Sequence, residues 1–70
     1  MLDPEKERER LATQISRVTK QLESSRRNLA NEQFVGKAPA HVVEAERSKA
    51  TDLESQIALL SQNLEALSGP

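Results

Sequence analysis

Basic side chains at regular spacing are the residues of this chain best suited to bind something. Counted in heptads with Ile15 at position a, five basic residues of the first half fall at the outward positions c and f. They form what we call the basic ridge: Lys6, Arg10, Arg17, Lys20 and Arg27. Point charges at intervals along a straight helix suit a phosphate backbone, which requires positive charge and no reading of bases. An ordinary solvated coiled-coil face would look similar, and this alternative stays open.

The positive charge is concentrated towards the middle of the chain, although the net charge is only −1. Residues 17–49 contain seven basic and four acidic residues, a sum of +3, whereas residues 50–70 contain three acidic residues and no Lys or Arg. Near the middle lies a group that we call the turn cluster: Arg26, Arg27, Lys37, Arg47 and Lys49. An anionic partner would therefore be attracted to this end.

No constellation for catalysis or for a bound cofactor is recognisable. The chain has no Cys and one His, His41, which we expect to be exposed at the start of a helix. The acidic residues are spread over surface heptad positions, and no glycine-rich phosphate loop occurs. We therefore predict no catalytic, cofactor-binding or metal-binding residues in this chain.

Phe34 is the only aromatic residue, and two roles are open for it. It can fold back to close the end of a helical seam against Leu29, Val42 and Val43. Alternatively, it can stack on an exposed base, as aromatic side chains do in RNA recognition.

The elements that must position these residues follow from composition and periodicity. Seventy residues with 36% hydrophobic content and one aromatic cannot fill a compact globular core. A charged fraction of 30% with a sustained aliphatic period is instead typical of a coiled coil. Apolar runs are no longer than four residues, so we expect neither a membrane span nor membrane association.

Aliphatic residues recur at heptad positions a and d in both halves. In the first half these are Leu11, Ile15, Val18, Leu22 and Leu29; in the second they are Val43, Ala50, Leu53, Ile57, Leu60, Leu64 and Leu67. The fold class is therefore all-α, an antiparallel two-helix coiled-coil hairpin. We expect one domain over residues 1–70, with a first helix at about 4–31, a turn at about 32–38 and a second helix at about 39–67.

The helix ends are also predicted from residue types. Asp3 followed by Pro4 suits a helix start. Asn31 is expected as a left-handed cap and Gly36 at positive φ, because these residues adopt that conformation most easily. Ala38 should be extended because it precedes Pro39, which opens a second helix without a capping side chain.

One antiparallel register pairs the aliphatic layers best. It sets Leu22 against Leu53 and Ser25 against Ala50, and it places Arg8 beside Leu67 at the base. Ser25 is interpreted as a small polar residue that the seam tolerates.

The segment between the helices carries a family resemblance. Leu29-Ala30-Asn31, Phe34, Lys37-Ala38-Pro39, Val42-Val43 and Glu44 through Arg47 resemble the C-terminal coiled-coil arm of valyl-tRNA synthetases, in the form L-x-N-x-x-F-x-x-K-A-P-x-x-V-V-x-x-E. Asp3-Pro4-Glu5 also looks like the start of that arm. The resemblance extends over essentially the whole chain, but only the motif between the helices is specific.

The resemblance implies an arm that leans on the outer corner of a valine-specific tRNA and supports the attachment of valine. It implies a cytoplasmic parent ligase that uses ATP, whereas the arm alone needs no cofactor and does not aminoacylate. Of the motif, Lys37 and Phe34 carry over directly. With the basic residues added from their heptad positions, the candidate RNA-binding residues are Arg10, Arg17, Lys20, Arg26, Arg27, Phe34, Lys37 and Arg47.

Another class of function remains open on the sequence. The chain could be a protein-interaction coiled coil, or the similar C-terminal hairpin of an ABC-type translation ATPase. The sequence also leaves open whether isolated hairpins self-associate into a four-helix bundle through Ala58, Leu59 and Ala66.

Overall fold

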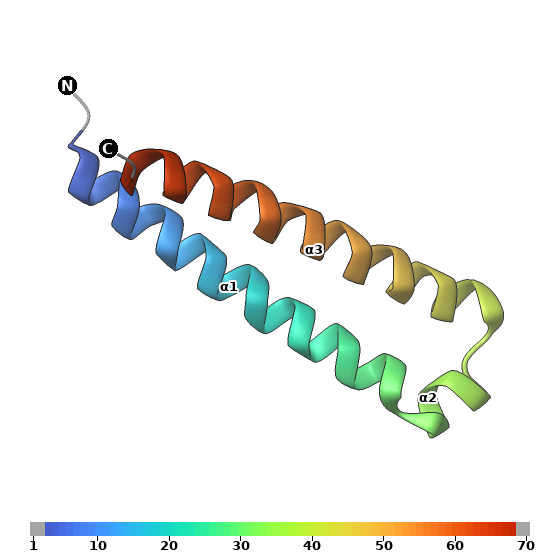
Figure 1. The fold of residues 1–70 in the computed structure, drawn as a ribbon. Coiled ribbons are helices and arrows are strands. Elements are labelled where there is room, and N and C mark those ends of the chain that lie inside the picture. The colour runs from blue at the N-terminus through green and yellow to red at the C-terminus, as the bar shows by residue number, and fades with distance from the viewer. Residues whose placement is uncertain (1–2, 69–70) are drawn as a thin grey trace.

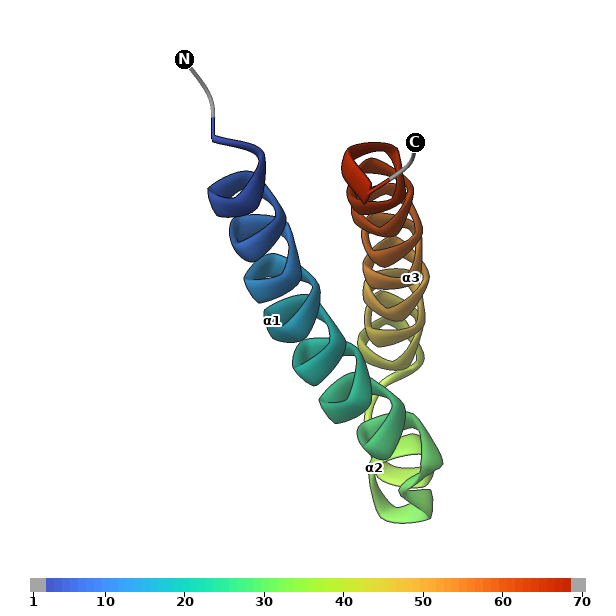
Figure 2. The same ribbon diagram turned by 60° about the vertical axis from the view of Figure 1, so that its left-hand side comes forward.

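The computed structural model describes residues 3–68 as two long antiparallel helices joined by a short one (Figure 1). These helices are α1 (Pro4–Ala30), α2 (Glu32–Lys37) and α3 (Ala40–Ser68), and no strand occurs in the described residues. The molecule is a rod with extents of 51 × 19 × 14 Å, and Figure 2 shows that α1 and α3 are inclined to each other. The predicted all-α helical hairpin is confirmed.

The start of α1 follows the sequence prediction. Asp3 is the N-cap, and its Oδ1 accepts a hydrogen bond from the backbone N–H of Glu5 at 3.0 Å. Pro4 occupies the first helical position, where no N–H is needed. Glu5 and Glu7 lie in the first turn, at the positive end of the helix dipole.

The connection between the long helices differs from the expected turn because it contains α2. Asn31 is extended (φ −82°, ψ 110°) and caps α2, with its Oδ1 accepting from the N–H of Gln33 at 3.0 Å. Gly36 lies inside α2, and no described residue has positive φ. The predictions of a left-handed Asn31 and of a positive φ at Gly36 are therefore wrong: the Asn31 side chain starts a new helix instead of ending the old one.

The entry to α3 is governed by Pro39. Ala38 is extended (φ −73°, ψ 148°), as predicted for a residue before proline. Its N–H donates to the Phe34 carbonyl at 2.9 Å and closes α2. The Pro39 carbonyl then accepts from the N–H groups of Val42 and Val43, at 3.0 and 3.2 Å, so α3 begins at Ala40, one residue later than expected.

The core is a thin line of side chains between α1 and α3. Leu22, Ala50 and Leu53 are buried together, and a partly buried set packs against them: Val18, Leu29 and Ile57. At the base, Arg8 Nη1 donates to the Leu67 carbonyl at 3.4 Å. Both observations agree with the predicted register.

A polar contact lies inside this seam near the turn. Ser25 is the most buried side chain, at 1% exposure, and its hydroxyl donates to Glu46 Oε1 at 2.7 Å. Asn28 Nδ2 donates to the same oxygen at 3.5 Å. Ser25 is therefore more than a tolerated small residue, because it holds a carboxylate that stands at heptad position d of α3.

None of the helices within residues 3–68 has an apolar stretch long enough to cross a membrane.

The helical conformation of Gly36 leads to a first prediction. A Cβ built at this position meets no atom within 4 Å, so alanine fits without a clash. We expect Gly36→Ala to raise the free energy of unfolding by about 0.5–1 kcal/mol, because alanine loses less backbone entropy in a helix than glycine. Urea denaturation followed by circular dichroism measures this. A loss of stability would instead indicate positive φ at this residue in solution.

The second prediction concerns pH. The hydrogen bond from Ser25 is the main cause that lowers the pKa of Glu46; partial desolvation opposes it, and Asn28 and Lys49 add to it. The folded-state pKa of Glu46 lies below the ordinary value of 4.5. Ionised Glu46 therefore stabilises the fold at pH values above 4.5, and this stabilisation is lost as the pH falls through the folded-state pKa. The wild type should therefore lose more stability than Glu46→Gln between about pH 6 and about pH 3.

The matched control for this measurement is Glu65→Gln on the same helix. Glu65 is exposed, and its side chain makes no hydrogen bond within the described residues. This control should follow the wild type. If Glu46→Gln and the wild type lose the same stability on acidification, the Ser25 contact does not stabilise the hairpin.

Candidate functional site

The free members of the basic ridge lie along one side of α1. Arg17, Lys20 and Arg27 are exposed, and none has a carboxylate within 4 Å in the part of the chain that the structure describes. Arg10, in contrast, is bound to Glu7 one turn earlier. Lys6 is likewise exposed and has no carboxylate within 4 Å among the described residues. The structure thus divides the predicted ridge into four available cations and one that is already neutralised locally.

The turn cluster is divided in the same way. Arg26 pairs across the seam with Glu54 at 3.1 Å, and Arg47 pairs with Glu44 at 3.6 Å. Lys37 is the last residue of α2, is exposed, and has no carboxylate partner within the described residues. Exposed ion pairs stabilise little, but each reduces the net positive charge presented at that point.

Sequence reasoning predicted some of these pairs and missed another. Helical spacing predicts five pairs within one helix, of which Glu7 with Arg10 and Glu44 with Arg47 are confirmed. The other three predicted pairs are not formed within the described residues: Glu5 with Arg8, Glu23 with Arg27 and Glu46 with Lys49. The Arg26 pair joins two helices, so spacing along one helix could not reveal it. A signal was present, because Arg26 and Glu54 both occupy position e, and e positions face each other in an antiparallel coiled coil.

Phe34 and His41 lie near the turn end of the rod. Phe34 and its neighbour Val35 on α2 are both half-buried, which agrees with packing at the end of the seam and leaves part of the ring accessible. His41 is exposed in the first turn of α3, as expected. Among residues 3–68, no three His, Cys, Asp or Glu side chains come close enough to hold a metal ion.

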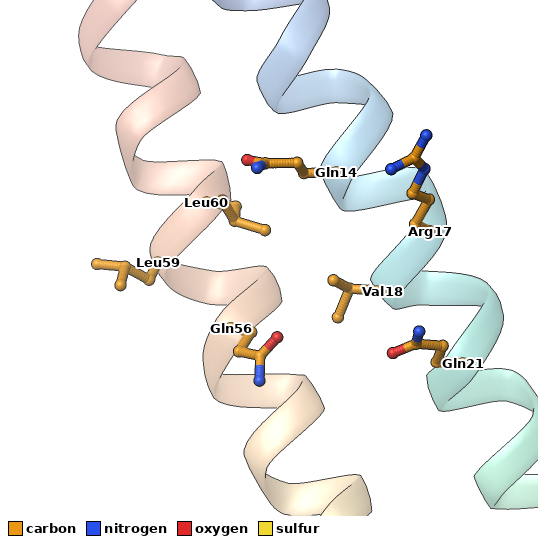
Figure 3. Close-up of a pocket in the computed structure, with 7 residues that line it drawn as sticks. All are labelled: Gln14, Arg17, Val18, Gln21, Gln56, Leu59 and Leu60. Carbon is orange, nitrogen blue, oxygen red and sulfur yellow. The ribbon is translucent and has the colours of Figure 1, made fainter.

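A groove between α1 and α3, beside the basic ridge, was not predicted. Its volume is about 440 Å³, and its lining consists of Gln14, Arg17, Val18, Gln21, Gln56, Leu59 and Leu60. Figure 3 shows Gln14, Val18 and Gln21 reaching from α1 towards α3, with Gln56 and Leu60 reaching back. The available signal was heptad position g, which glutamine occupies at 14, 21 and 56.

The lining of the groove is mostly aliphatic and uncharged. Its floor is aliphatic, its edges carry three amides, and Arg17 is its one charged residue. A second hollow of about 340 Å³ near the base has Glu7 as the one charged residue of its lining. The first groove is therefore uncharged apart from one cation, and that cation belongs to the basic ridge.

Comparison with known proteins decides the family. The family described as the valyl-tRNA synthetase tRNA-binding arm matches residues 3–68, which is the whole described hairpin. The chain belongs to this family. Membership of the valyl-tRNA synthetase arm family accounts for the motif between the helices, from Leu29 to Glu46, that the sequence alone pointed to.

Curated relatives of the arm family are valine-tRNA ligases. The ligase of Chlorobaculum tepidum is 45% identical over 64 residues, which are 91% of this chain and 7% of the ligase. That of Syntrophotalea carbinolica is 39% identical over 67 residues, 96% of this chain and 8% of the ligase. That of Phocaeicola vulgatus is 50% identical over 46 residues, 66% of this chain.

The chain therefore spans less than a tenth of the length of these relatives. No solved structure matches it.

Proposed function

We propose that this chain is the tRNA-binding arm of a valine-tRNA ligase and that it contacts the sugar-phosphate backbone of tRNA through α1 and the turn end. The observation that carries this proposal is the row of unpaired cations, Arg17, Lys20 and Arg27, on the outward side of a helix in this family. Ten residues separate the first from the last, so the row spans about 15 Å along α1. Several phosphates of one strand lie within that length.

The remaining candidate residues differ in how readily they can bind a phosphate. Lys37 adds an exposed free cation at the turn end. Arg10, Arg26 and Arg47 each neutralise a carboxylate in the free hairpin, so they contribute only if they exchange that partner for a phosphate. We rank them below the free cations for this reason.

The proposed role for the arm is to hold the outer corner of a valine-specific tRNA while the rest of the ligase attaches valine. ATP and the catalytic residues belong to that remainder, and no cofactor is assigned to the arm. We place this work in the cytoplasm, with no membrane involved. Binding by the isolated arm should be weak, because a few phosphate contacts provide modest affinity that falls with salt.

Salt dependence gives a sharp test of the free cations. Lys20→Gln should weaken tRNA binding and reduce the slope of log affinity against log salt concentration by about 1, because one phosphate contact is removed. Gln62→Glu is the matched control, since it lowers the net charge by the same one unit at an exposed position of α3 away from the turn end. Fluorescence anisotropy with labelled tRNA over a salt series measures both slopes.

Each outcome of this series has a meaning. Equal changes for Lys20→Gln and Gln62→Glu would show that the effect comes from net charge alone and that the binding face is not on α1. Absence of tRNA binding by the wild type at low salt would overturn the proposed function for the isolated chain. The triple variant Arg17→Glu, Lys20→Glu, Arg27→Glu should abolish binding at every salt concentration.

Phe34 separates packing from base stacking. Because the ring is half-buried, we expect its main role to be packing at the end of the seam. Phe34→Leu should then leave tRNA affinity unchanged, because leucine retains most of the apolar contact area. Removing one base–aromatic stack weakens binding by about fivefold or more. A loss of tRNA affinity of that size in the same anisotropy assay would therefore assign a stacking role to Phe34.

A further inference from the structure

We propose that the groove between α1 and α3 takes one unstacked nucleobase of the bound RNA. The groove here means the hollow lined by Gln14, Arg17, Val18, Gln21, Gln56, Leu59 and Leu60. This inference rests on the proposed function and deepens it, because it adds a base-binding site to the row of phosphate-binding cations. The site is assigned by the chemistry of its lining, its size and its position next to Arg17.

The lining suits a flat heterocycle with polar edges. Val18 and Leu60 form an aliphatic floor, and apolar atoms provide most of the groove surface. Gln14, Gln21 and Gln56 direct their amides into the space between the helices, as Figure 3 shows. Each primary amide offers both a donor and an acceptor, and this combination pairs with the donor and acceptor groups on the edge of a base.

The size of the groove agrees with this occupant. A volume of about 440 Å³ lies within the range of about 300–1,000 Å³ that small-molecule sites have in proteins. The groove is open along one side, so it can admit a base that remains attached to its strand. Single-stranded loops, whose bases can leave the stack, are the parts of RNA that proteins recognise most specifically.

Electrostatics connects the groove to the basic ridge. No carboxylate lines it, and its one charge is the free guanidinium of Arg17. A phosphate bound by Arg17 would therefore bring its own nucleotide to the edge of the groove. The hollow near the base has no cation in its lining, and its one charged residue is Glu7, which is paired with Arg10.

A second copy of the hairpin is the competing occupant. Leu59 at the groove edge is 59% exposed and could insert into the groove of a partner. A symmetric pair, however, would place two Arg17 residues at the same interface without a carboxylate in the groove of either copy to neutralise them. Charge therefore favours a nucleotide, and self-association becomes an outcome of the test.

The first experiment tests the groove without tRNA. The side-chain amide signals of Gln14, Gln21 and Gln56 should shift in NMR spectra of the 70-residue chain when nucleoside monophosphates are added. Inorganic phosphate should leave these signals in place, and the amide of the exposed Gln62 on α3 serves as the internal control. Equal shifts at Gln62, no shifts at all, or signals that instead depend on protein concentration would overturn the proposal.

The second experiment uses tRNA and a matched pair of variants. Gln56→Leu should reduce tRNA affinity about tenfold, the effect of losing one two-point hydrogen-bonded contact to a base, without changing the salt slope, because no phosphate contact is lost. Gln62→Leu makes the same change on the same helix outside the groove and should retain wild-type affinity. Thermal unfolding of both variants checks that each hairpin is intact.

The two proposals fail in different ways. If Gln56→Leu binds as the wild type does while the triple charge reversal on α1 abolishes binding, the groove proposal is wrong and the proposed function stands. If the wild type binds no tRNA but the groove amides still respond to nucleoside monophosphates, the site exists and the proposed function is wrong.

Discussion

The packing of α1 against α3 through one line of side chains is the constraint on which everything else in this protein depends. Leu22, Ala50 and Leu53 bury each other, while the aliphatic side chains packed against them, those of Val18, Leu29 and Ile57, are only partly covered. A two-helix rod has no second layer, so each helix exposes most of its circumference. The same geometry that limits stability therefore gives α1 a long outward side on which free cations can be arranged.

Polar groups in the seam have a specific structural effect. Glu46 occupies a seam position where an apolar side chain would bury more apolar surface. Its carboxylate instead accepts hydrogen bonds from Ser25 and Asn28 of the opposite helix. A carboxylate that requires two particular partners disfavours a shifted register, because any slip would leave it without them. We interpret this contact as fixing the alignment of the helices near the turn, the end at which Arg26, Arg27 and Lys37 lie.

The short helix α2 explains why the connection is more ordered than a loop. Asn31 caps it at one end, and the hydrogen bond from Ala38 closes it at the other. The motif between the helices thus has a local physical basis: Asn31 starts α2, Phe34 is half-buried within it, and Pro39 separates it from α3. Lys37 is placed at the last residue of α2, where a cation is favoured by the helix dipole.

The sequence by itself determined the all-α hairpin, its register, the cap at Asp3 and the outward position of Arg17, Lys20 and Arg27. Heptad periodicity settles the hairpin, its register and the outward positions, because it is a local repeat that two helices can satisfy in only a few ways. The cap at Asp3 follows instead from the residue types Asp3 and Pro4. Only the tertiary structure decided which cations are free, since the Arg26 pair with Glu54 joins residues 28 apart along the chain. It also decided the conformation of Asn31, because this residue type can either end one helix or cap the next. The groove at Val18 and Leu60 was likewise visible only in the tertiary structure. That groove depends on how closely two inclined helices approach, and the spacing of residues along either helix does not specify this distance.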